Sequence, residues 1–66
     1  MRIFLNGKEA ETQGAGNVAE LVDRYQMAPQ AVLIEHNGVA LHRREWNQQT
    51  LAEGDRIEII RVVAGG

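Results

Sequence analysis

The chain has 66 residues, no cysteine and a formal net charge of −2, which predicts one small domain without disulfides or thiolate metal sites. The seven Lys and Arg residues are scattered, and no basic stripe that would neutralise phosphates is present, so a nucleic-acid partner is not expected. Apolar runs are too short for a signal peptide or a membrane span. We therefore expect a cytoplasmic protein with no membrane partner.

The first predicted element is a β-hairpin. Residues 2–5 (RIFL) alternate in a way typical of a strand with one buried face, although Phe4 is ambiguous. Asn6-Gly7 is a hairpin turn signal because both residues tolerate positive φ. A second, weaker strand from Lys8 to about Thr12 is expected to return beside the first.

A helix is predicted after the loop at residues 13–16. Asn17 is followed three residues later by Glu20, the form of a capping box. Apolar residues then recur at helical spacing and place one stripe toward a sheet: Val18, Leu21, Val22 and Tyr25. Pro29 is expected to end the helix, because it disfavours helical geometry at the preceding residue.

The second half of the chain predicts another hairpin, a helical turn and a last strand. Residues 31–36 are strongly apolar and predict a strand. Asn37-Gly38 predicts a turn from this strand to a short return strand at 39–41. Residues 43–46 are expected to form a helical turn. From Arg56 to Val63 the alternation of apolar and charged residues again indicates a strand.

This order of elements predicts an α+β protein with the β-grasp fold, as a single domain over residues 1–66. A mixed sheet of four to five strands would carry one main helix on one face. The first and last strands would lie parallel, with a right-handed crossover between them. The other face of the sheet would stay open.

The open face is the first candidate functional surface. If Ile57 and Ile59 point toward the helix, strand alternation places Ile60 and Val62 on the open face, and Phe4 likewise in the first strand. Exposed apolar residues on a small protein indicate a surface where another protein docks. The alternative interpretation is that Phe4 simply covers a sheet edge.

The last six residues, RVVAGG, are the second candidate. Glycine loses the most conformational freedom on ordering and contributes no side chain to packing. A frayed chain end is one interpretation of Gly65 and Gly66. The other interpretation is that the active site of a partner enzyme admits only a chain end without side-chain bulk.

At this point the sequence resembles the thiamin-biosynthesis sulfur carrier family (ThiS), whose members are ubiquitin-like β-grasp proteins. The resemblance covers all 66 residues and rests on the order of its segments, not on any one of them. These are MRIFLNG at 1–7, VAELV at 18–22, Asn37-Gly38 before Arg43 and Trp46, GDRIEII at 54–60 and VAGG at 63–66.

The resemblance implies a function at the chain end. The carboxylate of Gly66, preceded by Gly65, would be adenylated by a ThiF-type adenylyltransferase that uses ATP and Mg²⁺. A persulfide donor would then supply sulfur for a thiocarboxylate, which passes its sulfur to a ThiG-type thiazole synthase. The chain would be a protein co-substrate, not an enzyme, and would be a monomer when free. It would bind no cofactor or metal itself, and its tail at about 63–66 would be flexible.

The same resemblance extends the set of partner-binding residues into the tail. Together with the open-face residues, the set is Phe4, Ile60, Val62, Val63 and Ala64. Fully extended, residues 63–66 span at most roughly 13 to 14 Å, which suits a narrow channel.

Two other functions stay open. One is a MoaD-like small subunit of molybdopterin synthase, which uses the same terminal chemistry but is commonly longer. The other is a β-grasp binding domain in which the Gly-Gly end is incidental. His36 and His42 are the only histidines, and without cysteine or a convergent set of carboxylates they favour turn or surface roles over metal binding.

Overall fold

The computed structural model describes residues 1–62. The tail predicted to be flexible, residues 63–66, lies outside this range. The strands are β1 (Arg2–Leu5), β2 (Lys8–Glu11), β3 (Val32–His36), β4 (Val39–Leu41) and β5 (Arg56–Arg61). The helix α1 (Val18–Arg24) and two 3₁₀ turns, η1 (Pro29–Ala31) and η2 (Arg43–Glu45), complete the described elements.

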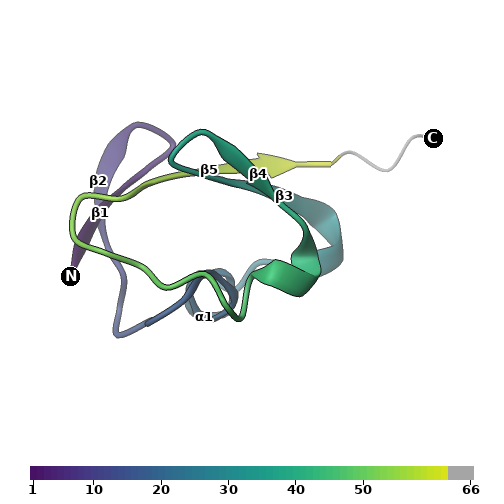
Figure 1. The fold of residues 1–66 in the computed structure, drawn as a ribbon, viewed down its shortest axis with the longest axis horizontal. Coiled ribbons are helices and arrows are strands. Elements are labelled where there is room, and N and C mark those ends of the chain that lie inside the picture. The colour runs from purple at the N-terminus through teal and green to yellow at the C-terminus, as the bar shows by residue number, and fades with distance from the viewer. Residues whose placement is uncertain (63–66) are drawn as a thin grey trace.

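The strands form one sheet in the order β2-β1-β5-β3-β4. The first and last strands pair in parallel, while β1 with β2, β3 with β4 and β3 with β5 are antiparallel. Figure 1 shows α1 beneath one face of this sheet, with the other face free of any described element. The predicted α+β architecture, a β-grasp fold with five strands, is confirmed.

Three predicted strand ends differ by one or two residues. Thr12 lies just beyond β2, and Ala31 belongs to η1, not to β3. The last strand ends at Arg61, although the Val62 amide still donates to the Ala31 carbonyl at 2.8 Å. Its predicted final residue, Val63, lies outside the described range.

The start of α1 is capped as predicted. The amide of Glu20 donates to Asn17 Oδ1 at 2.8 Å, which satisfies one of the free amides of the first turn. The reciprocal bond of the capping box shifts by one residue, because Glu20 Oε1 accepts from the amide of Gly16 at 2.7 Å. The backbone amide and the side-chain carboxylate of Glu20 therefore both stabilise the segment that leads into the helix.

The predicted helix end at Pro29 is wrong, since α1 ends at Arg24. Gln26 takes a left-handed conformation with φ 58°, and two bonds of a Schellman motif close the helix. The amide of Gln26 donates to the Asp23 carbonyl at 2.9 Å, and that of Met27 to the Val22 carbonyl at 3.1 Å. Pro29 instead opens η1, where its missing amide costs nothing. No helix of the described residues is long and apolar enough to cross a membrane.

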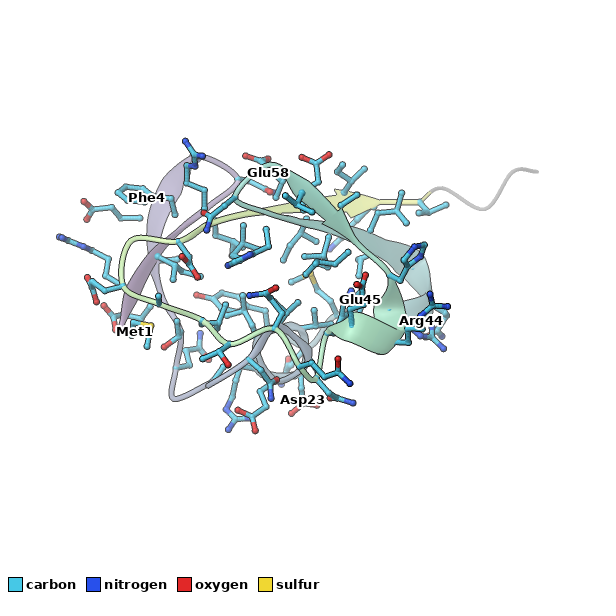
Figure 2. All side chains as sticks on the ribbon, in the orientation of Figure 1. Met1, Phe4, Asp23, Arg44, Glu45 and Glu58 are labelled. Atoms are coloured by element: carbon cyan, nitrogen blue, oxygen red, sulfur yellow. The ribbon has the colours of Figure 1, made fainter. Side chains whose placement is uncertain are left out.

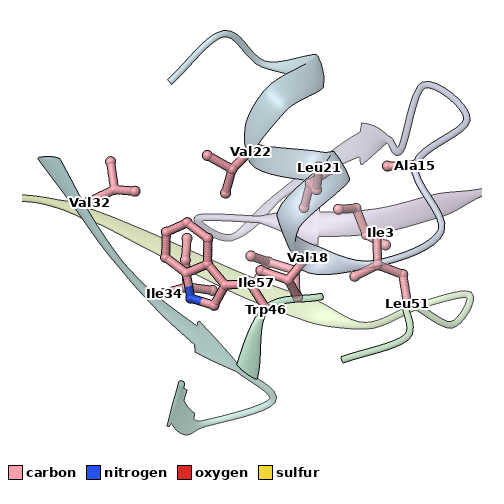
Figure 3. Packing of buried hydrophobic residues seen from close by; sticks show 10 residues of the cluster. All are labelled: Ile3, Ala15, Val18, Leu21, Val22, Val32, Ile34, Trp46, Leu51 and Ile57. Carbon is pink, nitrogen blue, oxygen red and sulfur yellow. The ribbon is translucent and has the colours of Figure 1, made fainter. Parts of the chain in front are cut away.

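The core fills the space between α1 and the sheet (Figure 3). Burying such side chains is worth about 1.5 to 3 kcal/mol each, and this is the main force that holds the helix to the sheet. Trp46, which follows η2, is 4% exposed and closes one side of the cluster. The buried members are Ile3, Ala15, Val18, Leu21, Val22, Val32, Ile34, Trp46, Leu51 and Ile57.

Two Asn-Gly hairpin turns hold the central strand β5 from its two sides. Asn6 Oδ1 accepts from the Ile59 amide at 2.7 Å and its Nδ2 donates to the Ile59 carbonyl at 3.3 Å, so this side chain continues the pairing that β1 itself ends at Leu5. On the other side, Asn37 Oδ1 accepts from the Arg56 amide at 2.8 Å. Both asparagines have positive φ, 51° and 50°. These contacts fix the position of the strand that leads into the tail.

Candidate functional site

Strand alternation divides β5 between the core and the open face. Ile57 is fully buried, whereas Ile60 and Val62 are 46% and 48% exposed. Figure 2 shows Phe4 and Glu58 on the side of the sheet away from α1. The open-face residues expected from the sequence therefore lie where alternation places them.

One exposed apolar residue next to Ile60 on the open face was missed from the sequence. Leu33 is 57% exposed and lies directly opposite Ile60 in the antiparallel pairing of β3 and β5. Opposite residues in such a pair share a face. Leu33, Ile60 and Val62 together form what we call the end patch. Alternation within Val32-Leu33-Ile34 indicates that Leu33 faces away from its two neighbours. Only the pairing of Leu33 with Ile60 shows that these two side chains form one surface.

Phe4 lies apart from the end patch. It is half-buried and lines a shallow pocket with Gly7, Arg56 and Glu58. Phe4 is opposite Arg56, and Ile60 and Val62 follow Arg56 by four and six residues, so the end patch begins roughly 13 Å from Phe4 and extends to roughly 20 Å. Since β1 has β2 on one side and β5 on the other, Phe4 does not cover a sheet edge.

Charged residues occupy the face between Phe4 and the end patch. Glu58 and Glu35 are directly opposite each other in the pairing of β5 with β3. Glu58 lies two residues from Arg56 and two from Ile60, so all three side chains share one face. Neither glutamate takes part in an ion pair within residues 1–62.

The remaining predicted site residues, Val63, Ala64, Gly65 and Gly66, lie outside the described residues. The described part of the chain ends at Val62, one residue after β5. Figure 1 shows the end of β5 away from the β1–β2 hairpin. Since four residues reach at most roughly 13 to 14 Å, an enzyme that takes hold of Gly66 has to come close to the end patch.

The two histidines have structural partners. His36 Nε2 donates to Asp55 Oδ2 at 2.8 Å, and both side chains are largely buried. His42 precedes η2, and its backbone amide donates to Glu45 Oε1 at 2.7 Å. No group of three metal-ligating side chains occurs in the described part of the chain.

Asp55 is the centre of a polar cluster that joins the β3–β4 turn to the start of β5. Its carboxylate also accepts from Asn37 Nδ2 at 3.1 Å and from the Ala52 amide at 2.9 Å. Burial on its own raises the pKa of Asp55. The hydrogen bonds from His36, Ala52 and Asn37, with the charge of His36, outweigh burial and leave the pKa below its ordinary value of 3.8.

We therefore expect Asp55→Asn to change how stability depends on pH. A carboxylate with a lowered folded pKa stabilises the fold above its ordinary pKa of 3.8 and loses this contribution as the pH falls through the folded pKa. The free energy of unfolding of the variant should be lower by roughly 1.5 to 3 kcal/mol at pH 7. The difference should shrink below about pH 4. Urea unfolding of both proteins at several pH values, followed by Trp46 fluorescence, measures the free energy of unfolding. A difference between wild type and variant that does not change with pH would contradict the lowered pKa of Asp55.

Comparisons with known proteins agree with this architecture. The sequence model of the ThiS family matches residues 3–66. A crystal structure of the thiamine biosynthesis protein ThiS from Geobacter metallireducens superposes with a TM-score of 0.83 at 33% identity, with 100% of both chains covered. A solution NMR structure of a thiamine biosynthesis protein from the same organism gives 0.81 at 33% identity and covers 100% of this chain and 88% of that one.

A more distant relative extends the likeness to another organism. The ycf40 protein of Trieres chinensis is 27% identical over 63 residues, which cover 96% of this chain and 86% of that protein. The similarity therefore spans the β-grasp body and, in the family match, continues through the last residue, Gly66.

Proposed function

Because this chain belongs to the ThiS family, we propose that it is a sulfur carrier of thiamin biosynthesis whose working group is the carboxylate of Gly66. The observation that carries the proposal is the family match over residues 3–66, which includes both terminal glycines. The likeness to the Geobacter ThiS structure over the full length of both chains supports it. In this role the chain is a substrate of other enzymes.

The chemistry of acyl activation explains a glycine at the reacting end. A chain-terminal carboxylate has an ordinary pKa of about 3.3 to 3.7, so it is ionised at neutral pH and resists nucleophiles. One of its oxygens attacks the α-phosphorus of ATP, pyrophosphate leaves, and a mixed anhydride with AMP forms. The partner enzyme supplies Mg²⁺ and cationic groups for this step.

Sulfur enters in the next step. A persulfide sulfur attacks the acyl carbon of the anhydride and AMP leaves. A thiol then attacks the donor-side sulfur and cleaves the S–S bond that came from the persulfide, which leaves a thiocarboxylate on Gly66 and a disulfide on the donor side. A thiazole synthase is the proposed acceptor of this sulfur. Glycine at positions 65 and 66 lets the chain enter two different active sites, because no Cβ obstructs close approach.

We propose that the end patch is the docking surface for these enzymes, with Val63 and Ala64 as the adjoining contacts. Exposed apolar side chains next to the departure point of the tail support this. Ile60 and Val62 lie within the reach of a partner that holds Gly66, whereas Phe4 lies roughly 13 Å from Ile60 and roughly 20 Å from Val62 along the strand direction. Phe4 and its pocket would form a separate contact with a partner large enough to cover the sheet.

The intact mass of the carrier tests the proposed function. The protein is incubated with its ThiF-type adenylyltransferase, ATP, Mg²⁺ and a persulfide donor. We expect a product in which one terminal oxygen is replaced by sulfur, located on Gly66 by fragmentation. A mass that stays unchanged with every component active would favour a β-grasp binding domain instead. Transfer of sulfur to the molybdopterin synthase large subunit, and not to thiazole synthase, would assign the chain to the other pathway.

A further inference from the structure

A pocket lies beyond the end of α1, beside the last residues of the described chain. It has a volume of about 300 Å³ and is bounded by the segment that joins α1 to β3 and by the end of β5. A water molecule has a share of about 30 Å³ in the liquid, so the pocket has room for a side chain. We call it the helix-side pocket, and its aliphatic lining consists of Met27, Ala28, Ala31, Val32 and Val62.

Backbone hydrogen bonds fix the walls of the helix-side pocket. The bonds from the Gln26 and Met27 amides that close α1 hold one wall. In η1, the Ala31 amide donates to the Ala28 carbonyl at 2.9 Å, and the Ala31 carbonyl accepts from the Val62 amide at 2.8 Å. The pocket is therefore preformed, and a preformed pocket binds without the cost of ordering its walls.

The helix-side pocket and the end patch meet at Val62. This residue lines the pocket and is also a member of the end patch, so two apolar surfaces adjoin at the end of the described chain. Four residues follow Val62, and they span at most roughly 13 to 14 Å. An enzyme that takes hold of Gly66 is therefore within reach of both surfaces.

The chemistry of adenylation gives a reason for contact with both surfaces. The mixed anhydride is a reactive acyl donor, and a water molecule that attacks its acyl carbon returns the carboxylate and releases AMP. Active sites prevent such side reactions by excluding water. An enzyme that contacted the end patch alone would leave a hollow open to water on the other side of Val62. Filling the helix-side pocket would close this path.

We propose that the helix-side pocket receives an apolar side chain of the enzyme that adenylates the carrier. This inference rests on the proposed function. Because the lining is aliphatic, the side chain that fits is a leucine, a methionine or a phenylalanine. Apolar anchors that fill a pocket on the partner carry much of the binding energy of protein interfaces. Together with the contact at the end patch, this anchor encloses the chain at Val62 from two sides.

Two substitutions at Ala28 test the proposed anchor. Ala28→Asp places a charge in the pocket and Ala28→Leu fills it. Since Ala28 is exposed, both variants should keep a thermal midpoint close to that of wild type. For each, kcat/KM for adenylation should fall about tenfold. More pyrophosphate should also be released per thiocarboxylate formed, because a site that admits water loses anhydride to hydrolysis. The matched controls are Gln48→Asp and Gln48→Leu, at an exposed residue outside the pocket lining, and they should behave as wild type.

Three outcomes would overturn the inference, and they are distinguishable. If wild type is adenylated and both Ala28 variants match it in kcat/KM and in pyrophosphate per thiocarboxylate, the pocket takes no anchor while the sulfur-carrier function stands. If both Ala28 variants lower the thermal midpoint of the free carrier, the pocket is already filled by the carrier's own chain, and the enzyme is not its occupant. If wild type is not adenylated at all, the sulfur-carrier function fails, and the inference that rests on it fails as well.

Discussion

Deletion of Gly66 is expected to abolish thiocarboxylate formation without changing the thermal unfolding of the domain. Within residues 1–62 the buried core is made of side chains from Ile3 to Ile57, and a glycine at position 66 has no side chain to contribute to packing. The shortened chain still ends in a carboxylate, now on Gly65, but this group is displaced by up to about 3.5 Å. A misplacement of only 1 Å at a reacting centre can cost about a hundredfold in rate. Intact mass after incubation with the adenylyltransferase, ATP and sulfur donor measures the loss.

Substitutions at Gly65 test the same idea while keeping the length of the chain. Gly65→Val adds a branched side chain one residue from the reacting carboxylate and should also abolish charging with sulfur. Gly65→Ala, which adds a single methyl group, should be impaired less. A normal yield of thiocarboxylate from either the deletion or the valine variant would show that the terminus is not the reactive group.

The parts of the fold that the sequence predicts well are those coded by neighbouring residues. Asn6-Gly7 and Asn37-Gly38 each make a hairpin where the turn rule expects it, and Asn17 caps α1. The end of α1 was missed because the left-handed residue there is Gln26, a type that gives no such signal. Local backbone hydrogen bonds from Gln26 and Met27 to the last turn of α1, not residue type, mark the helix end there.

The parts that sequence reasoning missed depend on pairing between distant segments. Nothing near Asp55 indicates that His36, 19 residues earlier, donates to it. Likewise, the opposition of Glu35 and Glu58 follows only from the register of β3 with β5. Of the candidate site, Ile60 and Val62 could be assigned to the open face by alternation alone, whereas Leu33 required knowledge of its partner strand.

Ile57→Ala is expected to have the largest effect on stability of the substitutions considered. Ile57 is fully buried on the central strand, and truncation of such a side chain costs about 2 to 5 kcal/mol. A domain of this size has a total stability of only about 3 to 10 kcal/mol. The variant should therefore unfold at a much lower temperature or be partly unfolded at 25 °C, as measured by circular dichroism or Trp46 fluorescence.

Ile60→Ala, the same substitution three residues along β5, is the matched control and should give the opposite pattern. Ile60 is 46% exposed on the open face, so its truncation removes little core packing and should leave the thermal midpoint close to that of wild type. Because Ile60 belongs to the end patch, kcat/KM for adenylation should fall about tenfold. For Ile57→Ala, kcat/KM per folded molecule should be retained. Equal losses of stability in the two variants would place Ile60 in the core and remove the end patch as a docking surface.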